Sequence, residues 1–183
     1  MVGRRRYGIV LGRFQPPHLG HVEYLRAARR RCERLVVGVT NPDLYALADA
    51  AEDPARSAGR NNPFTYHQRA LMLEAACADD GWSRDDYLIV PAPINQLDRL
   101  GQYLPPPDQA TFFVTIYDAW GEAKGRHLEA LGYPVETLWR RTMAERLTTG
   151  TEIRAGLRAG TLDWKRYVSP GVAALLEGYG RDL

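Results

Sequence analysis

The stretch Gly12-Arg13-Phe14-Gln15-Pro16-Pro17-His18-Leu19-Gly20-His21 lies between a short apolar run, residues 7–12, and a periodic stretch, residues 18–31. An apolar run that ends in glycine, followed by a Pro-Pro pair and a helical period, indicates a strand, a turn and a helix. Residues 33–40 repeat the strand pattern. The first 40 residues therefore predict a β-α-β unit with two parallel strands and a right-handed crossover.

The alternation of strand and helix patterns continues along the chain and predicts an α/β fold. Strands are expected over 87–91, 111–117 and 133–138, and helices over 65–78, 122–131, 152–159 and 170–179. This order is typical of a Rossmann-like, doubly wound parallel sheet with C-terminal helices. A length of 183 residues with 45% hydrophobic residues fits one domain, 1–183. Residues 42–62 lack a period and predict a long loop, either a lid or a disordered segment.

Composition excludes several classes of partner. Lys and Arg number 24 against 22 Asp and Glu, so the net charge of +2 demands neither nucleic acid nor an anionic membrane. Cys32 and Cys77 have neither metal-ligand nor disulfide-framework spacing, and they are expected to be core residues in a reducing compartment. No apolar run approaches the length of a membrane span. We therefore expect a cytoplasmic protein, and the sequence leaves open whether it forms a homo-oligomer.

The position of the histidine pair suits a phosphate ligand. In an open parallel sheet, ligands bind beyond the carboxyl ends of the strands, where a helix start offers unpaired N–H groups and a positive dipole end. Gly12 permits a close backbone approach, and His18 and His21 are three residues apart, so both project from one side of a helix. Two capped or solvent-facing histidines are the plainer alternative. A zinc site is a weaker one, because no third ligand is apparent.

A second helix start has the same character. Thr148-Thr149-Gly150-Thr151-Glu152-Ile153-Arg154 comes directly before a helical run. Thr149 or Thr151 can cap the helix, Gly150 permits close approach, and Arg154 offers a fork of donors suited to phosphate oxygens. An ordinary capping segment with a surface arginine is the alternative.

The two stretches GRFQPPHLGH and TGTEIR resemble the HxGH nucleotidyltransferase superfamily. The likeness covers nearly the whole chain and is strongest to archaeal-type nicotinamide mononucleotide adenylyltransferases, whose segments resemble Asn62-Pro63-Phe64-Thr65, Gln68-Arg69, Asp163-Trp164 and Val168-Ser169-Pro170. The resemblance implies the nucleotidyltransferase fold, with the C-terminal signature and helices in 148–183. It also implies that His18 and His21 contact the α- and β-phosphates of a nucleoside triphosphate, with Arg13 and Gln15 nearby. Residues 149–154 are implied to hold the β- and γ-phosphates, with Mg²⁺ bridging them.

The acceptor side departs from the adenylyltransferase pattern. Those enzymes carry a tryptophan after the third strand that stacks on nicotinamide, where this chain has Asn95-Gln96-Leu97-Asp98. The turn after the fourth strand also differs. The sequence is similar to phosphonoformate cytidylyltransferases of phosphinothricin-type biosynthesis, which implies CTP as donor and a small phosphonate acceptor. Synthesis of NAD from ATP remains the alternative, and a non-catalytic nucleotide sensor is the alternative of another class.

These arguments assign a role to each candidate residue. The catalytic candidates are His18, His21, Arg13 and Arg154; the nucleotide-binding candidates are Gly12, Phe14, Gln15, Gly20, Tyr117, Trp120, Thr149, Gly150 and Thr151; the acceptor-binding candidates are Lys124, Arg140, Arg141 and Asn95. Trp120 is equally well explained by packing, and Lys124 by a solvated helix face. No protein ligands are assigned to a metal. The expected partners are a nucleoside triphosphate and a small anionic phosphate or phosphonate.

Overall fold

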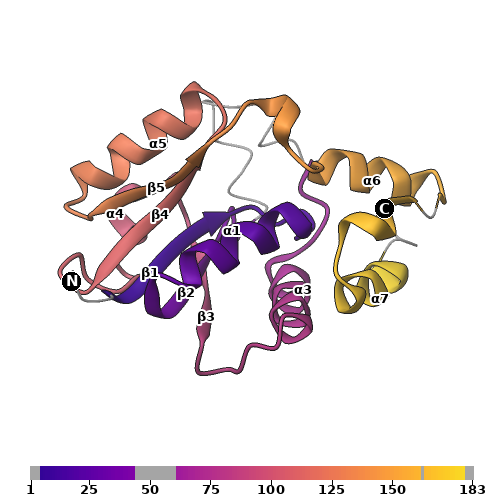
Figure 1. Ribbon diagram of the computed structural model, residues 1–183, viewed down its shortest axis with the longest axis horizontal. Helices are drawn as coiled ribbons and strands as arrows, with labels where there is room; N and C mark the ends of the chain where they lie inside the picture. Colours follow the sequence, from indigo (N-terminus) through magenta and orange to yellow (C-terminus); the bar gives the residue numbers. More distant parts are fainter. Residues whose placement is uncertain (1–4, 44–60, 162, 180–183) are drawn as a thin grey trace.

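The computed structural model describes residues 5–43, 61–161 and 163–179, and its strands form one parallel sheet (Figure 1). The five strands are β1 (Arg5–Gly12), β2 (Cys32–Thr40), β3 (Tyr87–Ala92), β4 (Ala110–Ile116) and β5 (Val135–Arg140). Their order across the sheet is β3-β2-β1-β4-β5, and all four neighbouring pairs are parallel. The order reverses direction at β1, which confirms the doubly wound α/β fold. The switch point beside β1 is where such folds bind ligands.

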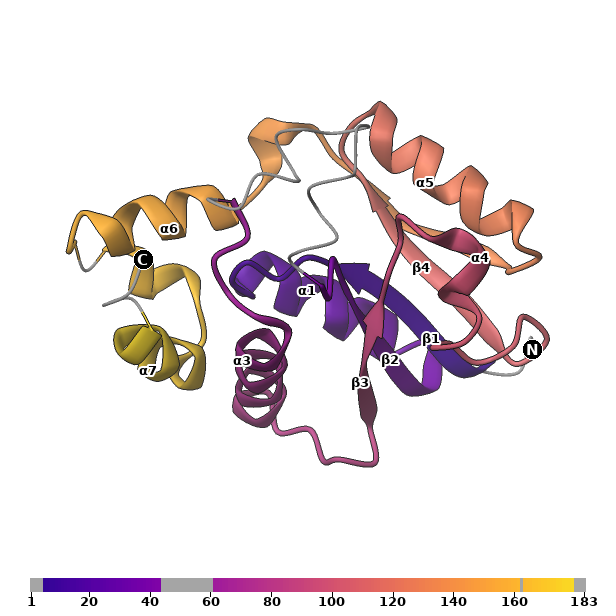
Figure 2. The same ribbon diagram turned by 180° about the vertical axis from the view of Figure 1, so that it is seen from behind.

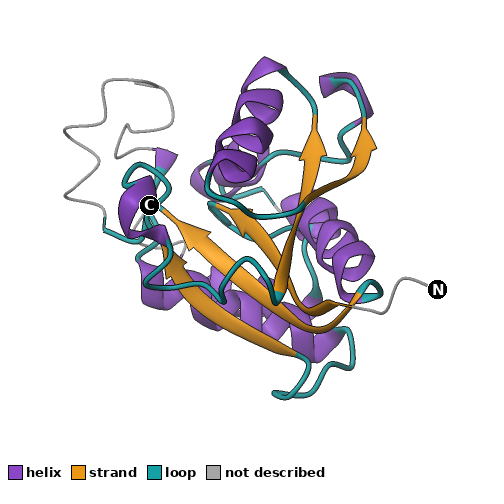
Figure 3. Cartoon of the chain, turned by 90° about the vertical axis from the view of Figure 1, so that its left-hand side faces the viewer, coloured by secondary structure: helices purple, strands orange, loops and turns teal. Residues whose placement is uncertain are grey.

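Helices cover both faces of the sheet, as Figure 3 shows from the side. They are α1 (Leu19–Arg29), α3 (Tyr66–Asp79), α4 (Leu97–Leu100), α5 (Ala119–Ala130), α6 (Gly150–Arg158) and α7 (Pro170–Tyr179), with short 3-10 helices at Met143–Glu145 and Asp163–Tyr167. Helices α1 and α3 share one buried cluster with the sheet, and α4 and α5 share another. Because both faces are covered, the three central strands β1, β2 and β4 carry continuous buried runs rather than alternating ones.

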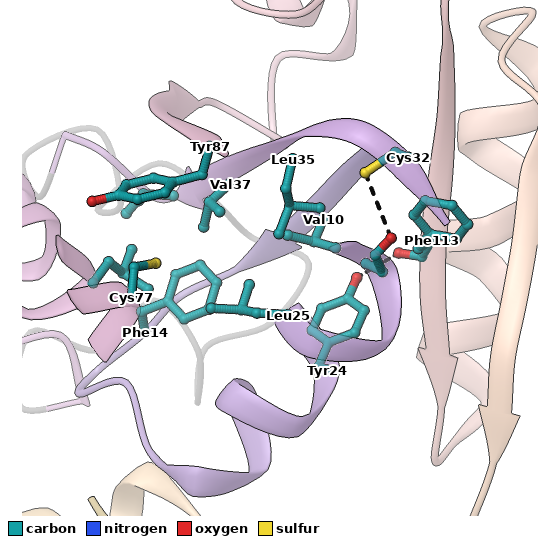
Figure 4. Packing of buried hydrophobic residues seen from close by; sticks show 13 residues of the cluster. Val10, Phe14, Tyr24, Leu25, Cys32, Leu35, Val37, Cys77, Tyr87 and Phe113 are labelled. Carbon is teal, nitrogen blue, oxygen red and sulfur yellow. Dashed lines mark hydrogen bonds between the residues drawn. The ribbon is translucent and has the colours of Figure 1, made fainter. Parts of the chain in front are cut away.

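Successive residues of β1 show how one apolar run serves both layers. Val10 packs into the cluster beneath α1 and α3, whereas Ile9 and Leu11 pack into the cluster beneath α4 and α5. Figure 4 shows the first of these clusters, in which the Tyr24 hydroxyl donates a hydrogen bond to the carbonyl of Phe113. Cys32 lies there as a buried free thiol, as does Cys77. Both cysteines thus have the core positions that their spacing predicts.

The C-terminal helices form a third packed layer. Helices α3 and α7 lie side by side in Figures 1 and 2, and they share a buried cluster with α6 that includes Phe64, Met72, Ile153 and Leu176. The amide of Gly171, at the start of α7, donates to the Asp79 carboxylate at 2.8 Å. This packing places the start of α6 beside the carboxyl end of β1.

Some boundaries differ from the predicted ones for local reasons. Helix α1 begins at Leu19, because His18 has extended backbone angles (φ −143°) and caps the helix. Helix α4 and the two 3-10 helices were not predicted, since short helices leave little periodic signal. The predicted loop or lid over 42–62 falls largely outside the described residues. No described helix is long and apolar enough to cross a membrane.

Candidate active site

The histidine pair lies at the junction of β1 and α1. The two imidazole rings stack with their centroids 3.8 Å apart and their planes 30° apart, and the backbone N–H of His18 donates to Nδ1 of His21 at 3.3 Å. A Cβ on Gly20 would lie 3.2 Å from Cε1 and Nδ1 of His18, so a side chain there would crowd the imidazole. The spacing of three residues thus places both rings on one side of the helix, as the sequence predicts.

Both imidazoles are uncharged at neutral pH. Burial lowers the pKa of His18 to about 4, with the charge of Arg146 acting in the same direction and that of Glu152 against it. Burial also lowers the pKa of His21 well below its usual value, helped by the charges of His18, Arg13 and Arg146. A neutral imidazole carries one N–H donor and one acceptor nitrogen. The positive charge of the site therefore comes from arginines.

Phe14 and Gln15, which the sequence assigns to nucleotide binding, support the turn from inside the fold. Phe14 is fully buried and meets the His21 ring edge-on at a centroid distance of 4.9 Å. The Gln15 amide donates to the carbonyl of Phe64 at 2.9 Å and accepts from the amide of Phe64 at 3.0 Å. Both side chains are occupied by the protein itself, because the turn must be anchored to the segment that precedes α3.

The start of α6 touches the same turn. Arg154 is almost fully buried, and its guanidinium donates to the carbonyl of Gln15 at 2.5 Å. A Cβ on Gly150 would lie 2.6 Å from that same oxygen, so only glycine fits there. Thr149 and Glu152 form a reciprocal capping box, with the Thr149 amide donating to the Glu152 carboxylate at 2.7 Å. The structure therefore brings the histidine turn and Arg154 together across 139 residues of sequence.

Two further arginines complete this cluster. The charge of Arg13 contributes to the lowered pKa values of His21 and of Arg154, the latter lowered to about 10 chiefly by burial. Arg69 is fully buried and donates to the carbonyls of Arg13 at 2.9 Å and Thr40 at 2.7 Å, which follow β1 and end β2. Arg69 therefore has a positioning role. The sequence pattern did not indicate this role, because an arginine within an apolar stripe of a helix usually extends its charged end to the solvent.

A cavity of about 440 Å³ opens at the carboxyl ends of β4 and β5. Its lining residues are Ile116, Tyr117, Asp118, Ala119, Glu122, Arg140, Arg141, Thr142 and Glu145. Three of the predicted ligand-binding residues, Tyr117, Arg140 and Arg141, thus lie around one space. Arg140 forms an ion pair with Glu122, and Arg141 binds Glu23 in bidentate fashion at 2.7 and 2.9 Å.

The nucleotide-binding candidate Trp120 and the acceptor candidates Lys124 and Asn95 lie outside this lining. Trp120 is 46% exposed at the start of α5, and the Lys124 ammonium lies 5.5 Å from the centre of its ring. Asn95 follows β3, three strands away from β4 in the order of the sheet. The structure therefore groups Tyr117 with Arg140 and Arg141 but does not place Trp120, Lys124 or Asn95 in the same wall.

Comparisons with known proteins agree with this geometry. The family model described as cytidylyltransferase-like matches residues 9–100, about half of the chain. A phosphonoformate cytidylyltransferase of Streptomyces viridochromogenes is 42% identical over 96% of this chain and 92% of its own length. This chain belongs to the cytidylyltransferase-like family. Membership confirms the prediction of a nucleotidyltransferase enzyme, in preference to a non-catalytic sensor.

Other members of the wider group match less closely. A nicotinamide-nucleotide adenylyltransferase of Pyrobaculum aerophilum is 29% identical over 92% of this chain and 86% of its own length. Among solved structures, a bifunctional NMN adenylyltransferase/ADP-ribose pyrophosphatase from Francisella tularensis superposes with a TM-score of 0.67 at 16% identity; the match covers 94% of this chain and 49% of that one. That enzyme has also been solved in complex with AMP and a manganese ion. The structural likeness shows that this cytidylyltransferase-like chain has the nucleotidyltransferase fold.

Proposed function

We propose that this chain transfers a CMP group from CTP to a small phosphonate acceptor such as phosphonoformate and releases pyrophosphate. The observation that carries the proposal is the meeting of the stacked pair His18 and His21 with Arg154 at one turn beyond the carboxyl end of β1. The choice of CTP and of a phosphonate is supported by the 42% identity to the Streptomyces cytidylyltransferase. It also fits the lack of a tryptophan in the segment 95–98 that follows β3.

In this proposal the chain supplies donors and charge rather than a base. The neutral imidazoles of His18 and His21 donate N–H groups to oxygens of the α- and β-phosphates, and the starts of α1 and α6 add backbone N–H groups. Arg13 and Arg154 provide the positive charge that a triphosphate requires. Because these donors are already in position, they can stabilise the charge that develops at the α-phosphate without having to reorganise.

The proposed reaction is a direct displacement in line. An ionised phosphonate oxygen forms a bond to the α-phosphorus, the bond from that phosphorus to the bridging oxygen breaks, and pyrophosphate leaves with both bonding electrons. A phosphonate acceptor is ionised at neutral pH, so the enzyme needs no general base. Mg²⁺ bound to the triphosphate would neutralise charge on the β- and γ-phosphates. The substrate would carry this ion, because the donors around His18 are imidazole and guanidinium nitrogens, which Mg²⁺ does not prefer.

The test is a matched pair of pyrophosphate-release assays. One contains CTP and phosphonoformate, and the other contains ATP and nicotinamide mononucleotide, both with Mg²⁺. We expect turnover in the first assay that exceeds that in the second by at least about 100-fold, since a base pocket that discriminates by hydrogen bonding commonly achieves that ratio. NAD synthesis from ATP without use of CTP would replace the proposal with adenylyl transfer, the activity named for the Pyrobaculum relative.

A further inference from the structure

Arg146 contacts the wall of the cavity beyond β4, and its charge acts on the histidine pair. It follows the 3-10 helix Met143–Glu145 and precedes α6. Its guanidinium carbon lies 4.2 Å from the centre of the Tyr117 ring, and Tyr117 lines the cavity. Its positive charge also helps to lower the pKa of both His18 and His21, after burial. One side chain therefore adjoins the two parts of the candidate site.

The partners of Arg146 differ from those of the neighbouring arginines. Arg140 and Arg141 are each neutralised by a carboxylate, Glu122 and Glu23 respectively. Among the described residues, no carboxylate pairs with Arg146, and its buried Nε has no hydrogen-bond partner. A buried polar atom left without a partner is uncommon and calls for an explanation. A fork of five donors beside two uncharged imidazoles is suited to an anion.

The surroundings hold the plane of this guanidinium in place. The indole N–H of Trp139, on β5, donates to the Tyr117 hydroxyl at 3.1 Å, which fixes the ring on which Arg146 stacks. Stacking leaves the edge of a guanidinium, where its N–H groups lie, available for a ligand. The arginine is therefore oriented by residues of β4 and β5 before any ligand arrives.

We propose that Arg146 binds the α-phosphate of the nucleotide and stabilises it during transfer. This inference rests on the proposed function, because it takes the histidine turn as the triphosphate site and the cavity as the space for the remaining substrate groups. The α-phosphate is the one group that joins these two spaces. During in-line displacement its oxygens carry the charge that a bidentate guanidinium is shaped to meet.

The decisive experiment measures binding of three probes by calorimetry. CMP and AMP each carry an α-phosphate, whereas inorganic pyrophosphate represents the other two phosphates. In Arg146→Gln we expect affinity for the mononucleotide that binds the unaltered enzyme to fall by about 10- to 100-fold, the usual effect of losing a charged hydrogen bond. Pyrophosphate affinity should change less than about threefold. Arg146→Lys, which keeps the charge but loses the fork, should lie between the two.

Controls separate a binding role from a merely structural one. Arg84→Gln makes the same change at an exposed arginine paired with Glu74, and it should leave all three affinities unaltered. Thermal melting of Arg146→Gln should match that of Arg84→Gln. Equal losses for mononucleotide and pyrophosphate, or no loss for either, would overturn the inference, as would failure of both CMP and AMP to bind the unaltered enzyme.

The same experiment tells the two proposals apart. If AMP binds and CMP does not, the choice of CTP as donor fails, while the effect of Arg146→Gln on AMP still decides the role of Arg146. If CMP binds equally well to the unaltered enzyme and to Arg146→Gln, the role of Arg146 fails and the cytidylyltransferase proposal stands. If the proposed role holds, turnover of Arg146→Gln should fall by about 100-fold, because the guanidinium would stabilise charge on the α-phosphate during transfer.

Discussion

His18 and His21 contact each other, and in the proposed function both also contact a phosphate ligand. Their ring centroids lie 3.8 Å apart, so a positive charge on one imidazole would oppose protonation of the other. Burial also disfavours the charged form of each ring. Two neutral imidazoles can donate N–H groups to neighbouring phosphate oxygens, and, unlike buried imidazolium ions, they need no paired anion when the ligand is absent. This explains how an anion site can be built on histidines that remain uncharged at neutral pH.

Replacement of either histidine by alanine should lower turnover by about 100-fold or more, because each removes a donor that acts in the transition state. Pyrophosphate release at saturating substrate measures this loss. His127→Ala is the matched control, because His127 is exposed on α5 and should leave turnover unchanged. Full activity in both His18→Ala and His21→Ala would refute their assignment.

Burial of His18 should also make stability depend on pH. Its folded pKa of about 4 lies below the unfolded value of 6.5, so between these values the unfolded chain binds more protons. The free energy of unfolding should therefore be unaffected above pH 6.5 and should fall as pH drops toward 4, by about 3 kcal/mol for this group. Urea unfolding of the unaltered chain and His18→Gln between pH 7.5 and 5 checks this, and the variant should show the shallower dependence.

At the scale of elements, the contact between α6 and the turn after β1 leaves no spare volume. Gly150→Ala would place a Cβ 2.6 Å from the Gln15 carbonyl, so one element must move. We expect a loss of about 1–3 kcal/mol in the free energy of unfolding, the usual cost of overpacking, together with weaker triphosphate binding. Gly125→Ala is the control, since a Cβ there meets nothing within 4 Å and α5 should gain slightly. Calorimetric titration with CTP reads out the binding.

Sequence patterns predict the helices and strands of this fold but not the contacts between them. The apolar run of β1, the Pro-Pro pair and the spacing of His18 and His21 are local signals, and they predict the first β-α-β unit and the side on which both rings lie. The hydrogen bond from Arg154 to Gln15 depends on the packing of α6 and α7 against α3, which no local pattern encodes. The pairing of Arg141 with Glu23 is hidden for the same reason.

The contacts of Arg69 and Gln15 that sequence reasoning missed share one physical cause. Arg69 donates hydrogen bonds to backbone carbonyls, and Gln15 hydrogen-bonds to the backbone of Phe64. Each side chain thus satisfies main-chain groups that only folding brings together. Residue type alone presents both as ligand-seeking polar groups. Arg146 escaped notice because its neighbours Tyr117 and His18 come from other parts of the chain.

For the whole molecule, nucleotide binding and stability should be linked. Residues of the candidate site come from β1, α1 and α6, so a ligand that bridges them binds the folded chain and not the unfolded one. Mg²⁺ and CTP at about 100 times the dissociation constant should stabilise the fold by about 2.7 kcal/mol. Thermal melting with and without CTP measures this, and EDTA should remove most of the increase if the metal arrives on the triphosphate. An equal increase with EDTA present would contradict delivery of the metal by the triphosphate.

The assignment of 1–183 to one domain remains a prediction.

The contact between Gln15 and Arg154 also has a consequence for biosynthesis. A ribosome releases the histidine turn early and the α6 guanidinium more than a hundred residues later. Until then the growing polypeptide holds only one side of the proposed nucleotide site, so we expect that CTP cannot assist the folding of the first β-α-β unit. Affinity for nucleotide should therefore appear late in translation, once α6 has packed against the turn that follows β1.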